Sequence, residues 1–126
     1  MKILVLDDDH TRLAKFRQKF IGHEVNCVET APMAILCLSR TKYQAVFLDH
    51  DLGGTVMASS GPGTGYEVAK WLEEHPDRKP EKIFIHSFNP VGSANMNRAL
   101  PEAQLVPGVW AMNEIFDKPD AKNEYS

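Results

Sequence analysis

Three short apolar segments set the strongest limit on how this chain folds. They span residues 3–6, 45–48 and 83–85, and none of them alternates apolar with polar side chains. Continuous apolar runs of this length are typical of strands buried on both faces, which occur in parallel sheets. Weaker strand patterns cover 25–28 and 103–106. The sequence therefore predicts a parallel sheet of five strands.

Helical patterns lie between these strands. Residues 11–20 place their apolar side chains on one face and end before Gly22. Thr30 is a good cap for a second helix, with Pro32 in its first turn, and a third helix is expected over about 66–74. An alternating order of strands and helices predicts an α/β fold, a doubly wound open sheet with helices on both faces.

Length and charge limit the class of protein. A chain of 126 residues suits one hydrophobic core, so we expect a single domain over 1–126 with a polar tail over 117–126. The net charge is -3 and no basic run is present, which argues against an extended nucleic-acid groove. No apolar run reaches membrane-spanning length, and Cys27 and Cys37 lie in apolar stretches as reduced thiols, so a cytoplasmic location is expected.

Carboxylates follow two of the predicted strands. The first strand runs directly into Asp7 and Asp8, and the third into Asp49 and, two positions later, Asp51. Ligands of doubly wound sheets bind beyond the carboxyl ends of the strands. Acids gathered there repel one another, and a hard divalent cation, Mg²⁺ or Mn²⁺, relieves that repulsion. The plainer alternative is a set of solvated loop acids and helix caps, with Asp9 well placed to cap the helix that follows.

These segments resemble a known family. Residues 3–9 (ILVLDDD) and 46–52 (VFLDHDL) are similar to the first and third strand motifs of response-regulator receiver domains, and residues 65–69 (GYEVA) resemble the start of their third helix. The resemblance implies a flavodoxin-like strand order of 2-1-3-4-5.

The same resemblance implies roles for the acids. Asp7, Asp8 and Asp49 would hold Mg²⁺, Asp49 would also accept a phosphoryl group, and Asp51 would offer its backbone carbonyl to the metal.

A second motif follows the fourth strand. His86 is a candidate for proton transfer beside the catalytic Asp49, and Asn89 with Pro90 reads as the start of a helix whose free amides bind an anion. The alternative to anion binding is that Asn89 and Pro90 only cap the helix. The candidate phosphate-binding residues are Ser87, Asn89, Gly92 and Asn95.

Residues 86–96 (HSFNPVGSANM) resemble the signature of a divergent branch of the receivers, the cyclic-phosphate processing receiver domains. That resemblance implies an enzyme acting on cyclic phosphates of nucleotides or RNA ends.

Two departures from signalling receivers stand out. Residues 53–65 are glycine-rich and make the distance from Asp49 to Gly65 unusually long, 16 positions (65 minus 49), which suggests a flap over the site. No lysine lies between Lys82 and Lys118, so the lysine that ends the fifth strand of signalling receivers is replaced by Lys118 or is missing.

Three functions fit these features. The favoured one is a metal-dependent phosphoesterase that hydrolyses a cyclic-phosphate nucleotide or RNA end. The alternatives are a switch that a partner kinase phosphorylates on Asp49, and a module that binds a cyclic nucleotide without turnover. Trp110 and Phe116 would pack the tail or form a homodimer patch.

Overall fold

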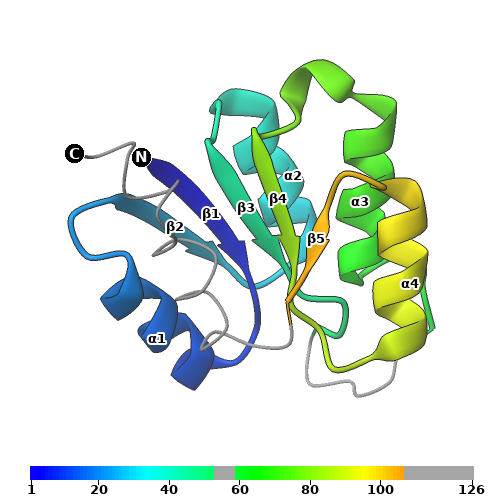
Figure 1. Cartoon of the computed structure of the whole chain (residues 1–126), viewed down its shortest axis with the longest axis horizontal. Coiled ribbons are helices and arrows are strands. Elements are labelled where there is room, and N and C mark those ends of the chain that lie inside the picture. The colour runs from blue at the N-terminus through cyan, green and yellow to red at the C-terminus, as the bar shows by residue number, and fades with distance from the viewer. Residues whose placement is uncertain (53–58, 107–126) are drawn as a thin grey trace.

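The computed structural model describes residues 1–52 and 59–106. Five parallel strands form one sheet in the order β2-β1-β3-β4-β5 (Figure 1). This confirms the predicted α/β class and the strand order 2-1-3-4-5, although β5 is shorter than the pattern indicated. The strands are β1 Lys2–Leu6, β2 Glu24–Val28, β3 Ala45–Leu48, β4 Lys82–Ile85 and β5 Gln104–Leu105.

Side-chain caps fix where the helices begin. The Asp9 carboxylate accepts hydrogen bonds from two backbone amides of the first turn of α1, and the Thr30 hydroxyl and the Asn89 side chain cap α2 and α4 in the same manner. Thr64 caps α3, just before Gly65. The helices are α1 His10–Lys19, α2 Ala31–Arg40, α3 Gly65–Glu74 and α4 Pro90–Ala99, with a 3₁₀ turn, η1, at Pro76–Arg78.

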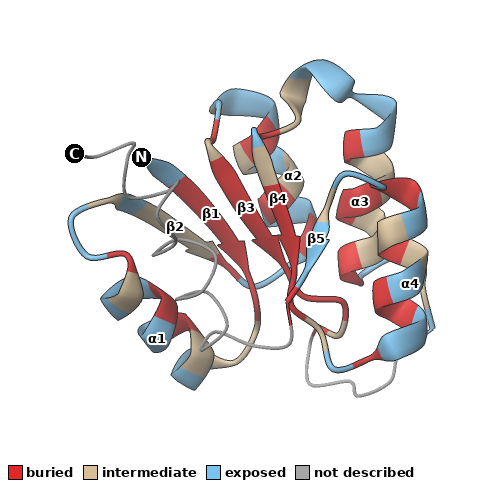
Figure 2. Cartoon of the chain, viewed as in Figure 1, coloured by how far each residue is buried: buried red, intermediate tan, exposed pale blue. Residues whose placement is uncertain are grey.

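Helices cover both faces of the sheet (Figure 1). On one face, α1 packs against Val5, Phe47 and Phe84. The rings of Phe47 and Phe84 stack with their centroids 4.7 Å apart. On the other face, α2, α3 and α4 pack against a core that includes Leu6 and Leu48. Figure 2 shows the central strands almost wholly buried between these two layers.

The strand register brings the carboxyl ends of β1, β3 and β4 to one line. Leu6 pairs with Leu48, and Leu48 with Ile85. The backbone amide of Asp49 then donates to the Leu6 carbonyl, and that of His86 to the Leu48 carbonyl, each over 3.0 Å. The residues that follow the three strands therefore lie side by side.

Alternation along β3 decides which way these residues face. Phe47 lies on the α1 face and Leu48 on the opposite face. Because side chains alternate along a strand, Asp49 follows Phe47 toward α1, and His50 follows Leu48 toward α4. Two different polar clusters thus form at the end of one strand.

Several expectations fall partly or wholly outside the described residues. The predicted flap includes residues 53–58, and the tail prediction, Lys118 and the aromatic pair Trp110 and Phe116 all lie in 107–126. Within residues 1–52 and 59–106, no helix combines the length and the hydropathy needed to cross a bilayer. Cys27 and Cys37 both carry free thiols.

Candidate functional site

Three carboxylates meet at the ends of β1 and β3. Asp7, Asp8 and Asp49, called the acidic cluster below, each place one ligand atom so that all three atoms lie within 4.8 Å of one another. Asp7 is fully buried and Asp49 is 4% exposed, whereas Asp8 reaches solvent. Three oxygen donors that converge at this spacing suit a hard divalent cation such as Mg²⁺.

Asp7 is the best satisfied member of the acidic cluster. Arg12 donates to both of its oxygens, from Nε over 2.7 Å and from Nη2 over 2.8 Å, and His86 Nε2 lies 3.0 Å from Oδ2. Burial by itself would raise the pKa of Asp7, but the hydrogen bonds with His86 and Arg12 outweigh it and hold the pKa at about 2. Asp7 is therefore a fixed negative charge at neutral pH.

Asp49 experiences the opposite balance. Burial, followed by the negative charge of Asp7, raises the pKa of Asp49 to about 7. Arg12 Nη2, 3.3 Å from Asp49 Oδ2, counteracts this rise only in part. Within residues 1–52 and 59–106, Arg12 thus does not fully offset the burial of Asp49 and the charge of Asp7, which is the property expected of a carboxylate at a cation site.

The sequence analysis did not identify Arg12. Asp9 caps α1, so Arg12 stands in the first turn of the helix, and side chains there lean back toward the helix start and the strand ends. The hydrogen bond with Asp7 raises the pKa of Arg12 and keeps the guanidinium charged. The signal was present in the sequence, because a basic residue three positions after a capping aspartate is directed toward the acids that precede it.

His86 lies beneath the acidic cluster. It is 4% exposed, its ring centroid is 5.1 Å from that of Phe16, and burial lowers its pKa. Its Nδ1 atom has no hydrogen-bond partner among the described residues. His86 contacts Asp7 directly, and Arg12 donates to both Asp7 and Asp49, so the predicted catalytic pair, His86 and Asp49, is linked only indirectly among the described residues.

A second polar cluster lies on the α4 side of the β3 end. His50 Nδ1 is 2.7 Å from Asp51 Oδ1, and His50 Nε2 is 2.9 Å from the Ser60 hydroxyl. Asn89 Nδ2 donates to the same Asp51 oxygen over 3.1 Å. We call His50, Asp51, Ser60 and Asn89 the His50 cluster. His50 was not among the predicted site residues, because its position after the third strand does not by itself fix the direction of its side chain.

The predicted phosphate-binding residues divide between structural roles. Asn89 Oδ1 accepts from the Gly92 amide over 2.9 Å, and Asn95 Nδ2 donates to the Ser60 hydroxyl over 2.9 Å, so these residues border the His50 cluster. The Ser87 hydroxyl accepts from the Asn89 amide over 3.1 Å at the start of α4. Phosphate binding by these residues stays a prediction.

Asp51 differs from the other predicted metal ligands. Its carboxylate contacts His50 and Asn89, so the acidic cluster contains three of the four expected carboxylates. The contribution expected from its backbone carbonyl stays a prediction.

Two glycines allow close packing around both clusters. A Cβ atom on Gly92 would lie 2.6 Å from Nδ1 of the His50 ring, so α4 approaches that ring in a way that only glycine permits. A Cβ on Gly65 would lie 2.8 Å from the Asp49 carbonyl carbon, and the Gly65 amide donates to the His50 carbonyl over 2.9 Å. The start of α3 is thereby held against the backbone of β3.

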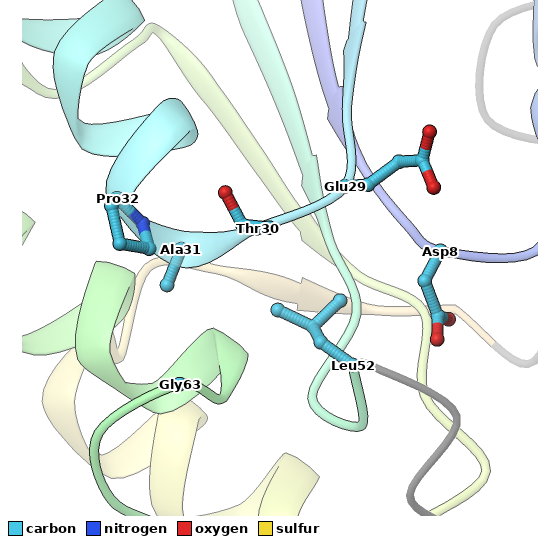
Figure 3. Close-up of a pocket in the computed structure, with 7 residues that line it drawn as sticks. All are labelled: Asp8, Glu29, Thr30, Ala31, Pro32, Leu52 and Gly63. Carbon is cyan, nitrogen blue, oxygen red and sulfur yellow. The ribbon is translucent and has the colours of Figure 1, made fainter.

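A pocket of about 470 Å³ opens beside the acidic cluster (Figure 3). Asp8 forms one wall, the β2–α2 turn with Thr30 and Ala31 forms another, and Leu52 and Gly63 close it from the side of β3 and α3. Its size falls within the range of small-molecule sites.

Comparison with known proteins agrees with this fold. A family model described as the cyclic-phosphate processing Receiver domain matches residues 2–102. The comparison with curated proteins gave no match.

Solved structures with a similar fold are signalling receivers. A CheY-like response regulator receiver domain from Methanospirillum hungatei JF-1 is 20% identical over 99% of this chain and 98% of its own, with a TM-score of 0.68. The signal receiver domain of a histidine kinase from Syntrophus aciditrophicus is 15% identical over 93% of this chain and 87% of its own, with a TM-score of 0.69. The response regulator TrrA from Thermotoga maritima, in complex with Mg(2+)-BeF, is 21% identical over 98% of this chain and 96% of its own, with a TM-score of 0.63. At these identities the likeness concerns the fold.

Proposed function

Because the chain belongs to the cyclic-phosphate processing receiver domain family, we propose that it is a metal-dependent phosphoesterase acting on a cyclic phosphate of a nucleotide or an RNA end. The observation that carries this proposal is the charge imbalance of the acidic cluster. Three carboxylates converge within 4.8 Å, and the pKa of Asp49 rises to about 7 despite the adjacent Arg12. A divalent cation with its bound phosphate would restore the balance.

In this proposal Asp8 and Asp49 hold Mg²⁺ or Mn²⁺ through carboxylate oxygens, with Asp7 and the backbone carbonyl of Asp51 completing the protein ligands. Carboxylate and carbonyl oxygens are the donors that these ions prefer. When bound, such an ion polarises a phosphate oxygen and helps to ionise water.

The remaining residues of the site act on charge and protons. Arg12, 3.3 Å from Asp49 through Nη2, stabilises negative charge that develops on the phosphate. Asp49 is the catalytic carboxylate. His86 contacts Asp7 and is buried, so in this proposal it acts by fixing the orientation of Asp7.

The pocket beside Asp8 provides space for the rest of the substrate. At about 470 Å³ it suits a nucleoside, and because its two charged lining residues, Asp8 and Glu29, are acids, the uncharged part of the substrate would lie there. Phe88 precedes α4, is 70% exposed and does not line this pocket; in this proposal its aromatic face stacks on a nucleobase that extends beyond the pocket.

A turnover assay tests this function. Purified protein with Mg²⁺ or Mn²⁺ is incubated with 2′,3′-cyclic nucleotides, cyclic dinucleotides and RNA ending in a cyclic phosphate, and products are followed by ³¹P NMR. We expect ring opening that Asp49→Asn and His86→Ala each reduce by on the order of 100-fold or more. His75→Ala is the matched control, because His75 lies at the end of α3 and stacks on Trp71. No turnover of any substrate with either metal would refute the hydrolase.

A phosphorylated switch is the second candidate, and the contact between Arg12 and Asp49 favours it, since a phosphoryl group on Asp49 would meet a cation there. Incubation with acetyl phosphate and Mg²⁺ would then give a base-labile adduct, detected by intact mass, that Asp49→Asn abolishes. Binding of a cyclic nucleotide in calorimetry with neither adduct nor turnover would instead indicate a binding module.

A further inference from the structure

We propose that Ser60 is a nucleophile toward a phosphate ester, with His50 as its proton acceptor and Asp51 as the group that orients His50. The three side chains form a continuous chain of hydrogen bonds, 2.9 Å from Ser60 Oγ to His50 Nε2 and 2.7 Å from His50 Nδ1 to Asp51 Oδ1. A hydroxyl, an imidazole and a carboxylate in this order and at these distances are the parts of an activated serine. Its three side chains are separate from the carboxylates of the acidic cluster, although Asp51 would also offer its backbone carbonyl to the proposed metal.

Neighbouring groups fix the direction of each hydrogen bond. Asn89 Oδ1 accepts from the Gly92 amide, so its Nδ2 group is the one that donates to Asp51. The Asp51 carboxylate accepts from His50, which places a proton on Nδ1 of the imidazole. In the neutral ring Nε2 then carries the lone pair, and the Ser60 hydroxyl donates to it. This is the tautomer in which an imidazole can remove the serine proton.

Packing holds the imidazole in that orientation. His50 is fully buried, and Gly92 of α4 approaches its ring more closely than any residue with a Cβ would allow. The His50 carbonyl also accepts the Gly65 amide, which fixes the backbone beneath the ring. Ser60 is partly exposed, whereas the His50 ring that would accept its proton is fully buried.

The surroundings of Ser60 favour an anionic substrate. Asn95 Nδ2 donates to the Ser60 hydroxyl over 2.9 Å, and the Arg98 guanidinium donates to Asn95 Oδ1 over 3.2 Å. An amide donor therefore contacts the serine and an exposed guanidinium lies one hydrogen bond beyond it, and both groups can interact with the oxygens of an attacked phosphate. A phosphate ester fits this environment better than a neutral carboxylic ester.

The reaction balances with the residues present and water. The Ser60 oxygen forms a bond to phosphorus while its proton passes to His50 Nε2, and the bond from phosphorus to the ester oxygen breaks. The leaving alkoxide takes the proton from His50. Water then attacks the phosphoserine ester, giving one proton to His50, and the released Ser60 oxygen recovers that proton.

A fluorophosphonate probe tests the nucleophile directly. Its fluoride is the leaving group, so reaction adds the phosphonyl group to the protein, and peptide mapping by mass spectrometry locates it. With EDTA present we expect labelling on Ser60, abolished by Ser60→Ala and slowed by on the order of 10³-fold by His50→Gln. Ser59→Ala, a change of the exposed neighbouring serine, should leave the rate unaltered.

Three results would overturn the proposal. These are labelling of wild-type protein no faster than of Ser60→Ala, attachment of the probe to another residue, and an unchanged rate in His50→Gln. A substrate comparison in EDTA tests the ester class, since turnover of bis(p-nitrophenyl) phosphate that requires Ser60 supports it and turnover of p-nitrophenyl acetate alone refutes it. Because neither assay uses a metal or a cyclic phosphate, their outcome is independent of the assay for cyclic-phosphate hydrolysis.

Discussion

The acidic cluster and the His50 cluster include successive residues, Asp49 and His50, at the end of β3, yet the electrostatic surroundings of their carboxylates differ. In the acidic cluster, buried like charges compete for Arg12, and the pKa values of Asp7 and Asp49 separate to about 2 and about 7. In the His50 cluster, the Asp51 carboxylate receives donors from both His50 and Asn89. Among the described residues, the burial of Asp49 is thus only partly compensated, as expected of a cation site, whereas the Asp51 carboxylate has hydrogen-bond donors from the protein itself.

The pH dependence of stability should separate the two clusters most strongly. Without metal, Asp49 binds its proton more tightly in the folded chain, with a pKa of about 7 against an ordinary 3.8, so its contribution to the free energy of unfolding falls as pH rises from about 4 to about 7. The difference is on the order of 4 kcal/mol. Urea unfolding in EDTA should therefore find Asp49→Asn more stable than wild type at pH 8 and close to wild type near pH 4.

Asp51→Asn is the matched control for that experiment. The chemical change is the same, but it removes a charge that accepts hydrogen bonds from His50 and Asn89, so we expect a loss of about 1–3 kcal/mol at pH 8. If Asp49→Asn and Asp51→Asn changed the free energy of unfolding at pH 8 in the same direction, the distinction between the two clusters would be contradicted.

Removal of Arg12 should have the next largest effect. Arg12→Gln leaves Asp7 and Asp49 without their shared cation, and because the Arg12 side chain is 27% exposed we expect a loss of about 2–3 kcal/mol at pH 8, below the cost of breaking a fully buried pair. Added Mg²⁺ should restore part of it, as measured by urea unfolding with and without the ion. Arg17→Gln on the exposed side of α1 serves as the control, and an equal loss there would rule out a special role for Arg12.

Packing of α4 on the His50 ring can be tested with a single methyl group. Gly92→Ala forces the ring or the helix to move, which should cost about 2 kcal/mol in unfolding free energy and shift the NMR signals of the His50 ring. Gly61→Ala is the comparison, because a Cβ there meets no atom within 4 Å. An unperturbed His50 signal in Gly92→Ala would show that the ring is not held by α4.

The smallest change in stability is expected at Phe88. Its side chain is 70% exposed, so Phe88→Ala should alter the free energy of unfolding by less than about 0.5 kcal/mol. If Phe88 stacks on a nucleobase, KM for a cyclic nucleotide should rise by roughly 5- to 10-fold. Val91→Ala, at a residue that is 69% exposed in the same helix start, should leave KM unchanged, and equal KM values for all three proteins would exclude stacking.

The fold could be predicted from sequence because apolar runs and helix caps are local signals. The run 45–48, for example, coincides with β3, and Thr30 and Asn89 cap helices as their positions indicated. The meeting of Asp7 and Asp49 followed from the same signals, since parallel strands end at one edge of a sheet.

The missing parts of the site depend on contacts between distant segments. Ser60 meets His50 across a glycine-rich stretch with no periodic pattern, and Gly92, which holds the ring, comes from another helix. The direction of His50 was available in principle, by counting the alternation onward from Phe47. The direction of the His50 side chain alone does not identify Ser60 as its hydrogen-bond partner.

The contact between Gly65 and Asp49 also has a mechanical consequence. Main-chain atoms of α3 and β3 touch with no side chain between them, so no flexible group can absorb a movement of either segment. When a ligand displaces the end of β3, the first turn of α3 must be carried along with it. A change in the position of Asp49 would thus be coupled to the position of the first turn of α3.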